Sequence, residues 1–296
     1  MSWQLSIGVE RVKCTHLDFS YRFFCCTSYF NLSIMNITNE QLNILCSIAL
    51  DAGREIMSVY AEDFSISHKE DASPLTEADL RADAVIRQGL EQHFPNVFIL
   101  SEESVSVSDK QHATERFFLV DPLDGTKEFL KRNGEFTVNI ALIENGISIA
   151  GVVYAPALNE LFYAARGLGA WVVKSGEKAT LQVQPIDGKT PLRVVGSRSH
   201  GADKLEAWLV ELNKPYTFTP FGSSLKFCRI ADGQADIYPR FGPTSQWDTA
   251  AAQCVLEVAG GSVCDLDGQT IRYGLEREIL NSEFIASGYD GVIGHQ

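Results

Sequence analysis

Two short apolar runs in the first half of the chain each end abruptly in acidic residues. The run Val97 to Leu100 is followed by Ser101-Glu102-Glu103, and the run Phe117 to Val120 is followed by Asp121. Short apolar runs of this length predict buried strands. Since α/β folds place their ligands at the carboxyl ends of buried strands, the pattern predicts an α/β fold with a carboxylate-lined site.

Helical and hairpin patterns surround these two runs. Apolar residues at helical spacing follow Thr38, and Thr76-Glu77-Ala78-Asp79 is typical of a capped helix start, which places Asp79 in a first turn. The segments Thr137 to Glu144 and Ile147 to Ala155 flank Asn145-Gly146, a strong hairpin signal. We therefore expect helices before the acidic strands and an antiparallel sheet after them.

Three parts of the chain are expected from these patterns. Residues 35–190 form an N-terminal α+β subdomain with the metal site, and residues 191–296 form a C-terminal α/β subdomain that completes it. The boundary follows a polar stretch, Lys174 to Pro191, before a new strand at Leu192. Residues 1–34 lack a sustained apolar periodicity. They are either a functional extension or a product of translation from an upstream start codon, and we favour Met35 as the true start.

Charge and cysteine content narrow the classes of function. The 25 Lys and Arg against 38 Asp and Glu give a net charge of −13, which argues against nucleic-acid binding and requires local cations for any anionic ligand. The seven cysteines show neither zinc-site nor disulfide spacing; Cys228, Cys254 and Cys264 are expected to fill core positions. Without a membrane-length apolar run or a signal peptide, we expect a cytoplasmic protein with no transmembrane segment.

The segment Asp121-Pro122-Leu123-Asp124-Gly125-Thr126 carries the most chemical information. Two carboxylates three residues apart and a carbonyl between them suit hard cations such as Mg²⁺, with Pro122 stiffening the turn. Gly125 permits close backbone approach, and the amides that follow can point at a phosphate. A plain surface turn is the alternative, because Asp, Pro and Gly all favour turns.

Three further acids lie at the ends of predicted elements. Asp79 opens a helix, Glu102 ends a strand, and Asp248 precedes an apolar helix expected from Thr249. Each also has an ordinary explanation. The alternative for Asp79 is an acid that stabilises the helix dipole, for Glu102 half of an exposed acidic pair, and for Asp248 a helix N-cap.

Taken together, these motifs resemble the inositol monophosphatase superfamily of Mg²⁺-dependent, lithium-sensitive phosphatases. The resemblance runs from about Met35 to the C-terminus, and its motifs in chain order are Thr76 to Asp79, Ser101 to Ser104, Asp121 to Thr126, Trp247-Asp248 and Ala259-Gly260-Gly261. Asp121 to Phe129, Gly222 to Cys228 and Ile237 to Arg240 are similar to the bacterial CysQ branch, the 3′(2′),5′-bisphosphate nucleotidases. The resemblance implies a layered αβαβα sugar-phosphatase fold with two apposed subdomains.

The resemblance also implies roles for individual residues. Glu102, Asp121 and the Leu123 carbonyl would hold one Mg²⁺, and Asp121, Asp124 and Asp248 a second, with a third, weaker ion beside Glu102. The implied catalytic residues are Asp79, Thr126 and Glu102, with Asp79 and Thr126 activating the attacking water. The implied substrate-binding residues are Glu102, Leu123, Asp124, Gly125, Thr126, His200, Ser223, Lys226, Arg240 and Asp248. A solvated loop histidine is the alternative for His200, and the sequence assigns no partner to Lys127.

The implied activity is hydrolysis of adenosine 3′,5′-bisphosphate to AMP and phosphate, with 3′-phosphoadenylyl sulfate as a second substrate, in the nucleotide recycling of sulfur assimilation. One alternative is an inositol or fructose bisphosphate phosphatase on the same scaffold. Lys127-Glu128-Phe129 and the set Ser223, Lys226 and Arg240 disfavour it. The other is an inactive sensor of Mg²⁺ and nucleotide. The branch resemblance also implies a weak peripheral association with the membrane, and it leaves the oligomeric state open.

Overall fold

The computed structural model of the chain describes residues 37–61, 66–68, 74–104, 115–184, 191–197 and 202–289. The predictions for residues 1–34, for a start at Met35 and for His200 lie outside these residues.

Two long helices form the first layer. Thr38 caps α1 (Asn39–Tyr60) in a capping box with Gln41: the Thr38 hydroxyl accepts from the Gln41 amide, and the Gln41 side chain accepts from the Thr38 amide. Two short strands, β1 (Ile66–His68) and β2 (Pro74–Thr76), pair before α2 (Glu77–His93). The predicted helix start at Thr76 to Asp79 is confirmed, and Asp79 lies buried in the first turn of α2.

A seven-stranded sheet forms the second layer. Its strands lie in chain order: β3 (Phe98–Ser101), β4 (Arg116–Asp124), β5 (Thr137–Glu144), β6 (Ile147–Ala155), β7 (Glu160–Ala165), β8 (Gly169–Lys174) and β9 (Glu177–Thr180). β3 and β4 are parallel, whereas the other neighbours are antiparallel, and the hairpin predicted from Asn145-Gly146 is confirmed. β9 falls inside the stretch interpreted as a boundary. Its four residues are all exposed, so no apolar pattern marks this edge strand.

The second half of the chain builds a smaller sheet in the order β11-β10-β12-β14-β13. Its strands are β10 (Leu192–Gly196), β11 (Tyr216–Pro220), β12 (Ile237–Arg240), β13 (Ser262–Asp265) and β14 (Phe284–Ser287). α3 (Thr126–Leu130) follows β4 of the large sheet, and the helices in the second half of the chain are α4 (Ala202–Glu211), α5 (Leu225–Ala231) and α6 (Gln246–Val258). The division into subdomains near residue 190 stays an interpretation of this topology.

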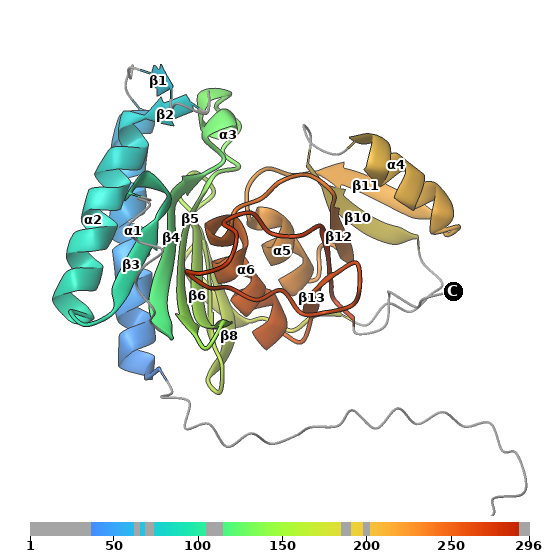
Figure 1. The fold of residues 1–296 in the computed structure, drawn as a ribbon. Helices are drawn as coiled ribbons and strands as arrows, with labels where there is room; N and C mark the ends of the chain where they lie inside the picture. The colour runs from blue at the N-terminus through green and yellow to red at the C-terminus, as the bar shows by residue number, and fades with distance from the viewer. Residues whose placement is uncertain are drawn as a thin grey trace, which may run out of the picture. The chain divides into compact units, whose positions relative to one another are not determined.

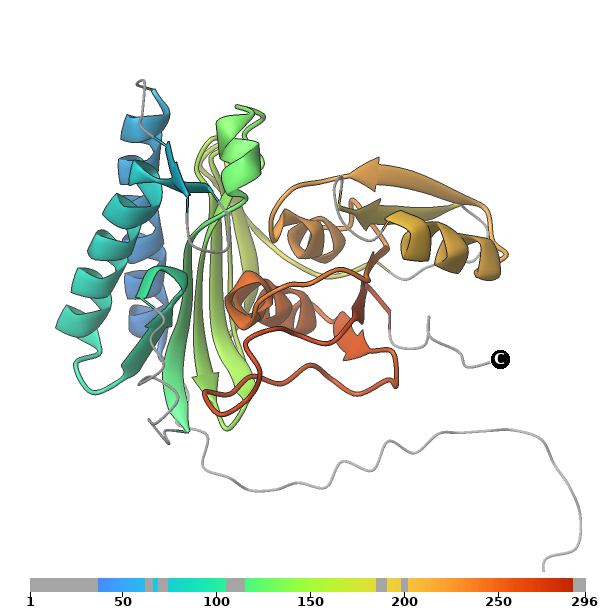
Figure 2. The ribbon, with the colours of Figure 1, turned by 45° about the horizontal axis from the view of Figure 1, so that its top comes forward.

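Figures 1 and 2 show that helices and sheets alternate within residues 37–289. α1 and α2 cover one face of the large sheet, α5 and α6 lie between the two sheets, and α4 covers the outer face of the smaller sheet. The layered αβαβα prediction is therefore confirmed. Among the described residues, no helix combines the length and apolar character needed to cross a membrane.

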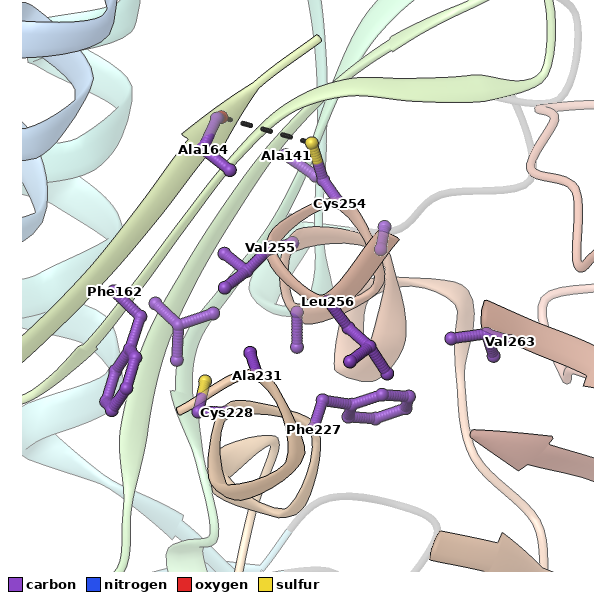
Figure 3. Close-up of a cluster of buried hydrophobic side chains, with 14 of the residues drawn as sticks. Ala141, Phe162, Ala164, Phe227, Cys228, Ala231, Cys254, Val255, Leu256 and Val263 are labelled. Atoms are coloured by element: carbon purple, nitrogen blue, oxygen red, sulfur yellow. Dashed lines mark hydrogen bonds between the residues drawn. The ribbon is translucent and has the colours of Figure 1, made fainter. Parts of the chain in front are cut away.

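The largest cluster of buried apolar side chains joins the two sheets. Figure 3 shows part of it: Cys228 lies on the side of α5 toward Phe162 of the large sheet, and Phe227 lies on the other side of α5, near Leu256 of α6. The approach of α6 to the large sheet is close: a Cβ on Gly151 of β6 would collide with the Ala251 carbonyl. This packing fixes the N-termini of α5 and α6 against the ends of the strands that carry the acids.

Candidate active site

Ten of the twelve predicted site residues line one cavity of about 260 Å³. They are Glu102, Asp121, Leu123, Asp124, Gly125, Thr126, Ser223, Lys226, Arg240 and Asp248. Asp79 does not line it but lies close enough for its charge to raise the pKa of Asp121. The twelfth residue, His200, lies outside the described residues.

The first acids come from two parallel strands. Ser101 pairs with Val120, so the residues that follow each of them, Glu102 and Asp121, lie next to each other at this end of the sheet. Asp121 is only 1% exposed. The Ser101 hydroxyl donates to the buried carboxylate of Asp83 on α2, which holds the end of β3 beside the helix that carries Asp79.

The Asp-Pro-Leu-Asp segment is not the turn that the sequence predicted. Asp121 pairs with Asn139 and Asp124 with Thr137 at the end of β4, and the register shifts between these two pairs. The segment is therefore a bulged strand end, a common way of redirecting side chains beside active sites. The Leu123 amide donates to the Asp121 carboxylate over 3.0 Å, so the carboxylate is oriented by its own strand.

Gly125 provides the sharp step from this bulge into α3. Its φ of +93° lies in the left-handed region that glycine adopts without strain. The Thr126 hydroxyl lies 3.5 Å from the Leu123 carbonyl oxygen. The motif thus brings carboxylates, a carbonyl and a hydroxyl to the same wall of the cavity.

The remaining carboxylate arrives from α6. The sequence predicted a helix from Thr249, but α6 begins at Gln246; its N-cap is Ser245, so the alternative explanation of Asp248 as the N-cap is wrong. Asp248 occupies the third helical position, where its Oδ2 accepts from the Ser245 amide over 2.8 Å in a capping box. The polar Ser245 and Gln246 gave no apolar signal for this earlier start.

Carboxylate oxygens of Glu102, Asp121 and Asp248 lie within 4.8 Å of one another. Burial, and then the charges of Glu102, Asp124 and Asp248, raises the pKa of Asp121 well above its ordinary range. Burial raises the pKa of Asp248 to about 8 and that of Asp124 to about 6. A buried all-oxygen cluster with this excess of negative charge suits a hard divalent cation such as Mg²⁺.

The same cavity is also lined by two cations. Lys226 is 5% exposed; its ammonium group donates to the Phe221 and Ser223 carbonyls and lies 5.2 Å from the ring centre of Tyr238. Burial lowers its pKa to about 8. Arg240 donates to the Gly242 and Pro243 carbonyls over 3.1 and 2.6 Å. Because lysine carries three donors and arginine five, both have N–H groups beyond those bonded to these carbonyls.

Sequence reasoning missed the residue that joins the two halves of the site, Ser224. Its amide donates to the Asp124 carboxylate, and its hydroxyl meets the side chains of Asn139 (2.7 Å) and Thr137 (2.9 Å) on β5. The sequence singled out the neighbouring Ser223, which does line the cavity. The position of Ser224 directly before an apolar helix can be seen in the sequence. Its side-chain partners cannot, because Asn139 and Thr137 lie 85 and 87 residues away along the chain.

Comparison with known proteins agrees with this geometry. The sequence profile of the Inositol monophosphatase family matches residues 38–294, so the chain belongs to that family.

Individual relatives narrow the comparison. CysQ of Salmonella typhimurium, a 3′(2′),5′-bisphosphate nucleotidase, is 48% identical over 250 residues, which are 84% of this chain and 100% of that protein. The Escherichia coli CysQ is 47% identical with the same coverage. The crystal structure of CysQ from Bacteroides thetaiotaomicron superposes with a TM-score of 0.75 at 34% identity, covering 85% of this chain and 98% of that chain.

Proposed function

We propose that this chain is a Mg²⁺-dependent 3′(2′),5′-bisphosphate nucleotidase that hydrolyses adenosine 3′,5′-bisphosphate to AMP and phosphate. The observation that carries the proposal is that one cavity is lined both by clustered carboxylates and by the two cations Lys226 and Arg240. Relatives that match over their whole length and are named as nucleotidases of this class support the choice of substrate. We extend the proposal to 3′-phosphoadenylyl sulfate and to a cytoplasmic location.

The carboxylates would hold the metal ions. Glu102, Asp121 and the Leu123 carbonyl would bind one Mg²⁺, and Asp121, Asp124 and Asp248 a second, with a third, weaker ion beside Glu102. Their fit rests on the donor set: three carboxylates offer oxygen atoms within 4.8 Å of one another, and burial together with the charges of Glu102 and Asp248 raises the pKa of Asp121 until a cation offsets them. When bound, Mg²⁺ supplies Lewis acidity toward water and phosphate oxygens.

The chain's own groups would orient the reactants. We assign Asp79 and the Thr126 hydroxyl to positioning the attacking water and taking up its proton. The amides of Gly125 and Thr126 would donate to phosphate oxygens, whose charge changes in the transition state. No covalent intermediate is required, and burial raises the pKa of the Cys254 thiol to about 12, which makes it a poor nucleophile.

The cations of the cavity would select the nucleotide. Ser223, Lys226 and Arg240 would contact the phosphate that is not cleaved, and His200 would lie against the adenosine. Charge-assisted hydrogen bonds from a lysine and an arginine suit such a group.

Phosphate release across a panel of substrates tests the proposal. Adenosine 3′,5′-bisphosphate should be hydrolysed with the highest kcat/KM, ahead of 3′-phosphoadenylyl sulfate, and well ahead of inositol 1-phosphate and fructose 1,6-bisphosphate. Removing divalent cations with a chelator should stop release, and adding Mg²⁺ back should restore it. A preference for inositol 1-phosphate would replace the proposal with the phosphatase alternative, and Mg²⁺-dependent nucleotide binding without phosphate release would indicate a sensor.

A further inference from the structure

The segment from Gly274 to Asn281 holds the N-terminus of α6, the helix that carries Asp248. The Gln246 side chain donates to the Gly274 and Glu278 carbonyls over 3.1 and 2.9 Å and accepts from the Gly274 amide over 2.9 Å. Ser245 also forms an isolated β-bridge with Leu280. The start of α6 is therefore fixed by hydrogen bonds to a distant part of the chain, not by its own cap alone.

Asn281 contacts residues that flank Asp248 in the sequence. Its Nδ2 donates to the Ser245 carbonyl over 2.7 Å and to the Thr249 hydroxyl over 3.0 Å, and its backbone amide donates to the Thr244 carbonyl over 2.8 Å. Thr244 and Thr249 line the catalytic cavity, whereas Asn281 does not. Asn281 thus contacts residues on both sides of Asp248 from outside the cavity.

Ser245 transmits this contact to the Asp248 carboxylate. Its amide donates to the Asp248 Oδ2 over 2.8 Å, and its carbonyl, which accepts from Asn281, also accepts from the Asp248 amide over 3.2 Å. Both backbone polar groups of Ser245 therefore bond to Asp248. A shift of Ser245 would move the carboxylate relative to Glu102 and Asp121.

The Thr249 hydroxyl adds a second link. It accepts from Asn281 and lies 3.2 Å from the Gln246 carbonyl oxygen and 3.0 Å from the Tyr273 hydroxyl oxygen. Thr249 is 1% exposed, so losing one of these partners leaves a buried polar group with fewer bonds. An amide suits position 281 because its two N–H groups reach two acceptors on the same turn.

We infer that Asn281 is a positioning residue that sets the Asp248 carboxylate for metal binding, acting through Ser245 and Thr249. The inference rests on the proposed metal site. Residues that orient metal-binding carboxylates commonly change metal affinity when they are replaced, although they touch neither metal nor substrate.

Direct titration of Mn²⁺ into the full chain, followed by the electron paramagnetic resonance signal of the free ion, tests the inference without turnover. Asn281→Ala should weaken Mn²⁺ binding by roughly tenfold to a hundredfold. The Mg²⁺ concentration for half-maximal activity should rise by a similar factor, whereas KM for the nucleotide at saturating Mg²⁺ should stay close to the wild-type value. Asn281→Ser, which keeps a shorter hydrogen-bonding group, should weaken Mn²⁺ binding less, and it serves if the alanine variant does not fold.

Val255→Ala is the matched control. Val255 lies on the same helix, is fully buried in the apolar cluster between the two sheets, and does not line the catalytic cavity. Its replacement should lower the melting temperature while leaving Mn²⁺ affinity unchanged. Wild-type affinity in the Asn281 variants, or an equal loss in Val255→Ala, would overturn the inference. Failure of the wild-type chain to bind Mn²⁺ would instead contradict the metal site itself, and the inference with it.

Discussion

The catalytic cavity has an acidic part, Glu102, Asp121, Asp124 and Asp248, and a cationic part, Lys226 and Arg240, which are called here its acid end and its cationic end. The two are built on opposite principles. At the acid end, every charged neighbour that shifts the pKa of Asp121 is itself acidic, so burial and repulsion act in the same direction. At the cationic end, burial lowers the pKa of Lys226, but the Asp124 carboxylate opposes that shift and backbone carbonyls accept its hydrogen bonds. Asp121, at the centre of the acid cluster, therefore has no compensating cation among the charges that act on it, whereas Lys226 is partly compensated.

This difference indicates which partners each end requires. Uncompensated buried carboxylates are costly, so the acid end gains most from bound cations. The cationic end is already ordered by carbonyl groups and keeps donors for an anion, which suits a phosphate that binds and leaves without rearranging the protein. A ligand with two phosphates, one near the metals and one near Lys226 and Arg240, satisfies both ends.

The largest expected effect comes from the acid end. Asp121→Asn removes the carboxylate assigned to both metal ions and should lower kcat at least about a hundredfold, a barrier increase of roughly 2.7 kcal/mol. The metal-free variant should melt at or above the wild-type temperature, because a source of repulsion with Glu102, Asp124 and Asp248 is gone. Steady-state phosphate release at saturating Mg²⁺ and a thermal melt in chelator measure the two effects.

Retention of more than about a tenth of wild-type kcat, a barrier change below ~1.4 kcal/mol, would show that Asp121 does not bridge two metals. Asp83→Asn is the control for loss of a buried carboxylate outside the metal site, because Asp83 is buried and accepts a hydrogen bond from Ser101 but does not line the cavity.

Replacing a cation should affect substrate choice more than turnover in general. Lys226→Met keeps the apolar stem beside Tyr238 but removes the charge, and it should reduce kcat/KM for adenosine 3′,5′-bisphosphate about ten- to a hundredfold, as expected for a lost charge-assisted hydrogen bond. The loss should be much smaller for adenosine 3′-phosphate, which lacks the second phosphate. Arg240→Ala should behave in the same way. Equal losses on both substrates would assign these residues to holding the loop carbonyls of Phe221 or Gly242 instead.

The identity of the acidic residues could be predicted from the sequence, but their arrangement could not. The acids stand next to apolar runs and inside short motifs, so Glu102, Asp121 and Asp124 could be singled out from local pattern alone. Their geometry could not, because the bulge between Asp121 and Asp124 depends on pairing with β5, and turn propensity suggested a surface turn. The hairpin around Asn145-Gly146 was predictable because its signal is local, whereas β9 has no apolar signal at all.

The links between distant segments were beyond sequence reasoning. Ser224 meets Asn139 and Thr137 only after α5 packs on the large sheet, and Asn281 meets Ser245 only after the chain returns past α6. Propensity and periodicity describe single elements, so they carry no information about such tertiary contacts.

A smaller effect should appear as a pH dependence of stability in the metal-free protein. Native Asp121, Asp124 and Asp248 hold protons that the unfolded chain, with ordinary pKa values near 4, has already released. Their protonated forms therefore favour the fold below about pH 4, and this contribution is lost as pH rises through about 6 for Asp124 and about 8 for Asp248. The melting temperature in chelator should fall between about pH 5 and pH 8.

Mg²⁺ should reverse this trend, because it binds the deprotonated carboxylates. The gain in melting temperature on adding Mg²⁺ should be larger near pH 8 than near pH 5, and Asp121→Asn should show a smaller gain at both. A gain independent of pH would mean that the acid end is already ionised without metal, against the raised pKa values.

The smallest effect is expected at Ser224, which connects the two ends without belonging to either. Ser224→Ala keeps the backbone amide that binds Asp124 but leaves Thr137 and Asn139 without a buried partner, which should reduce the free energy of unfolding by about 1–3 kcal/mol. Thr137→Val removes one of the same bonds and leaves the other. If the three side chains act as one network, urea unfolding of the single and double variants should give a coupling energy of at least ~0.5 kcal/mol, because residues that share a partner are not additive. Strict additivity would mean that the halves of the site are joined by packing alone, and that the two ends of the cavity are held independently of this network.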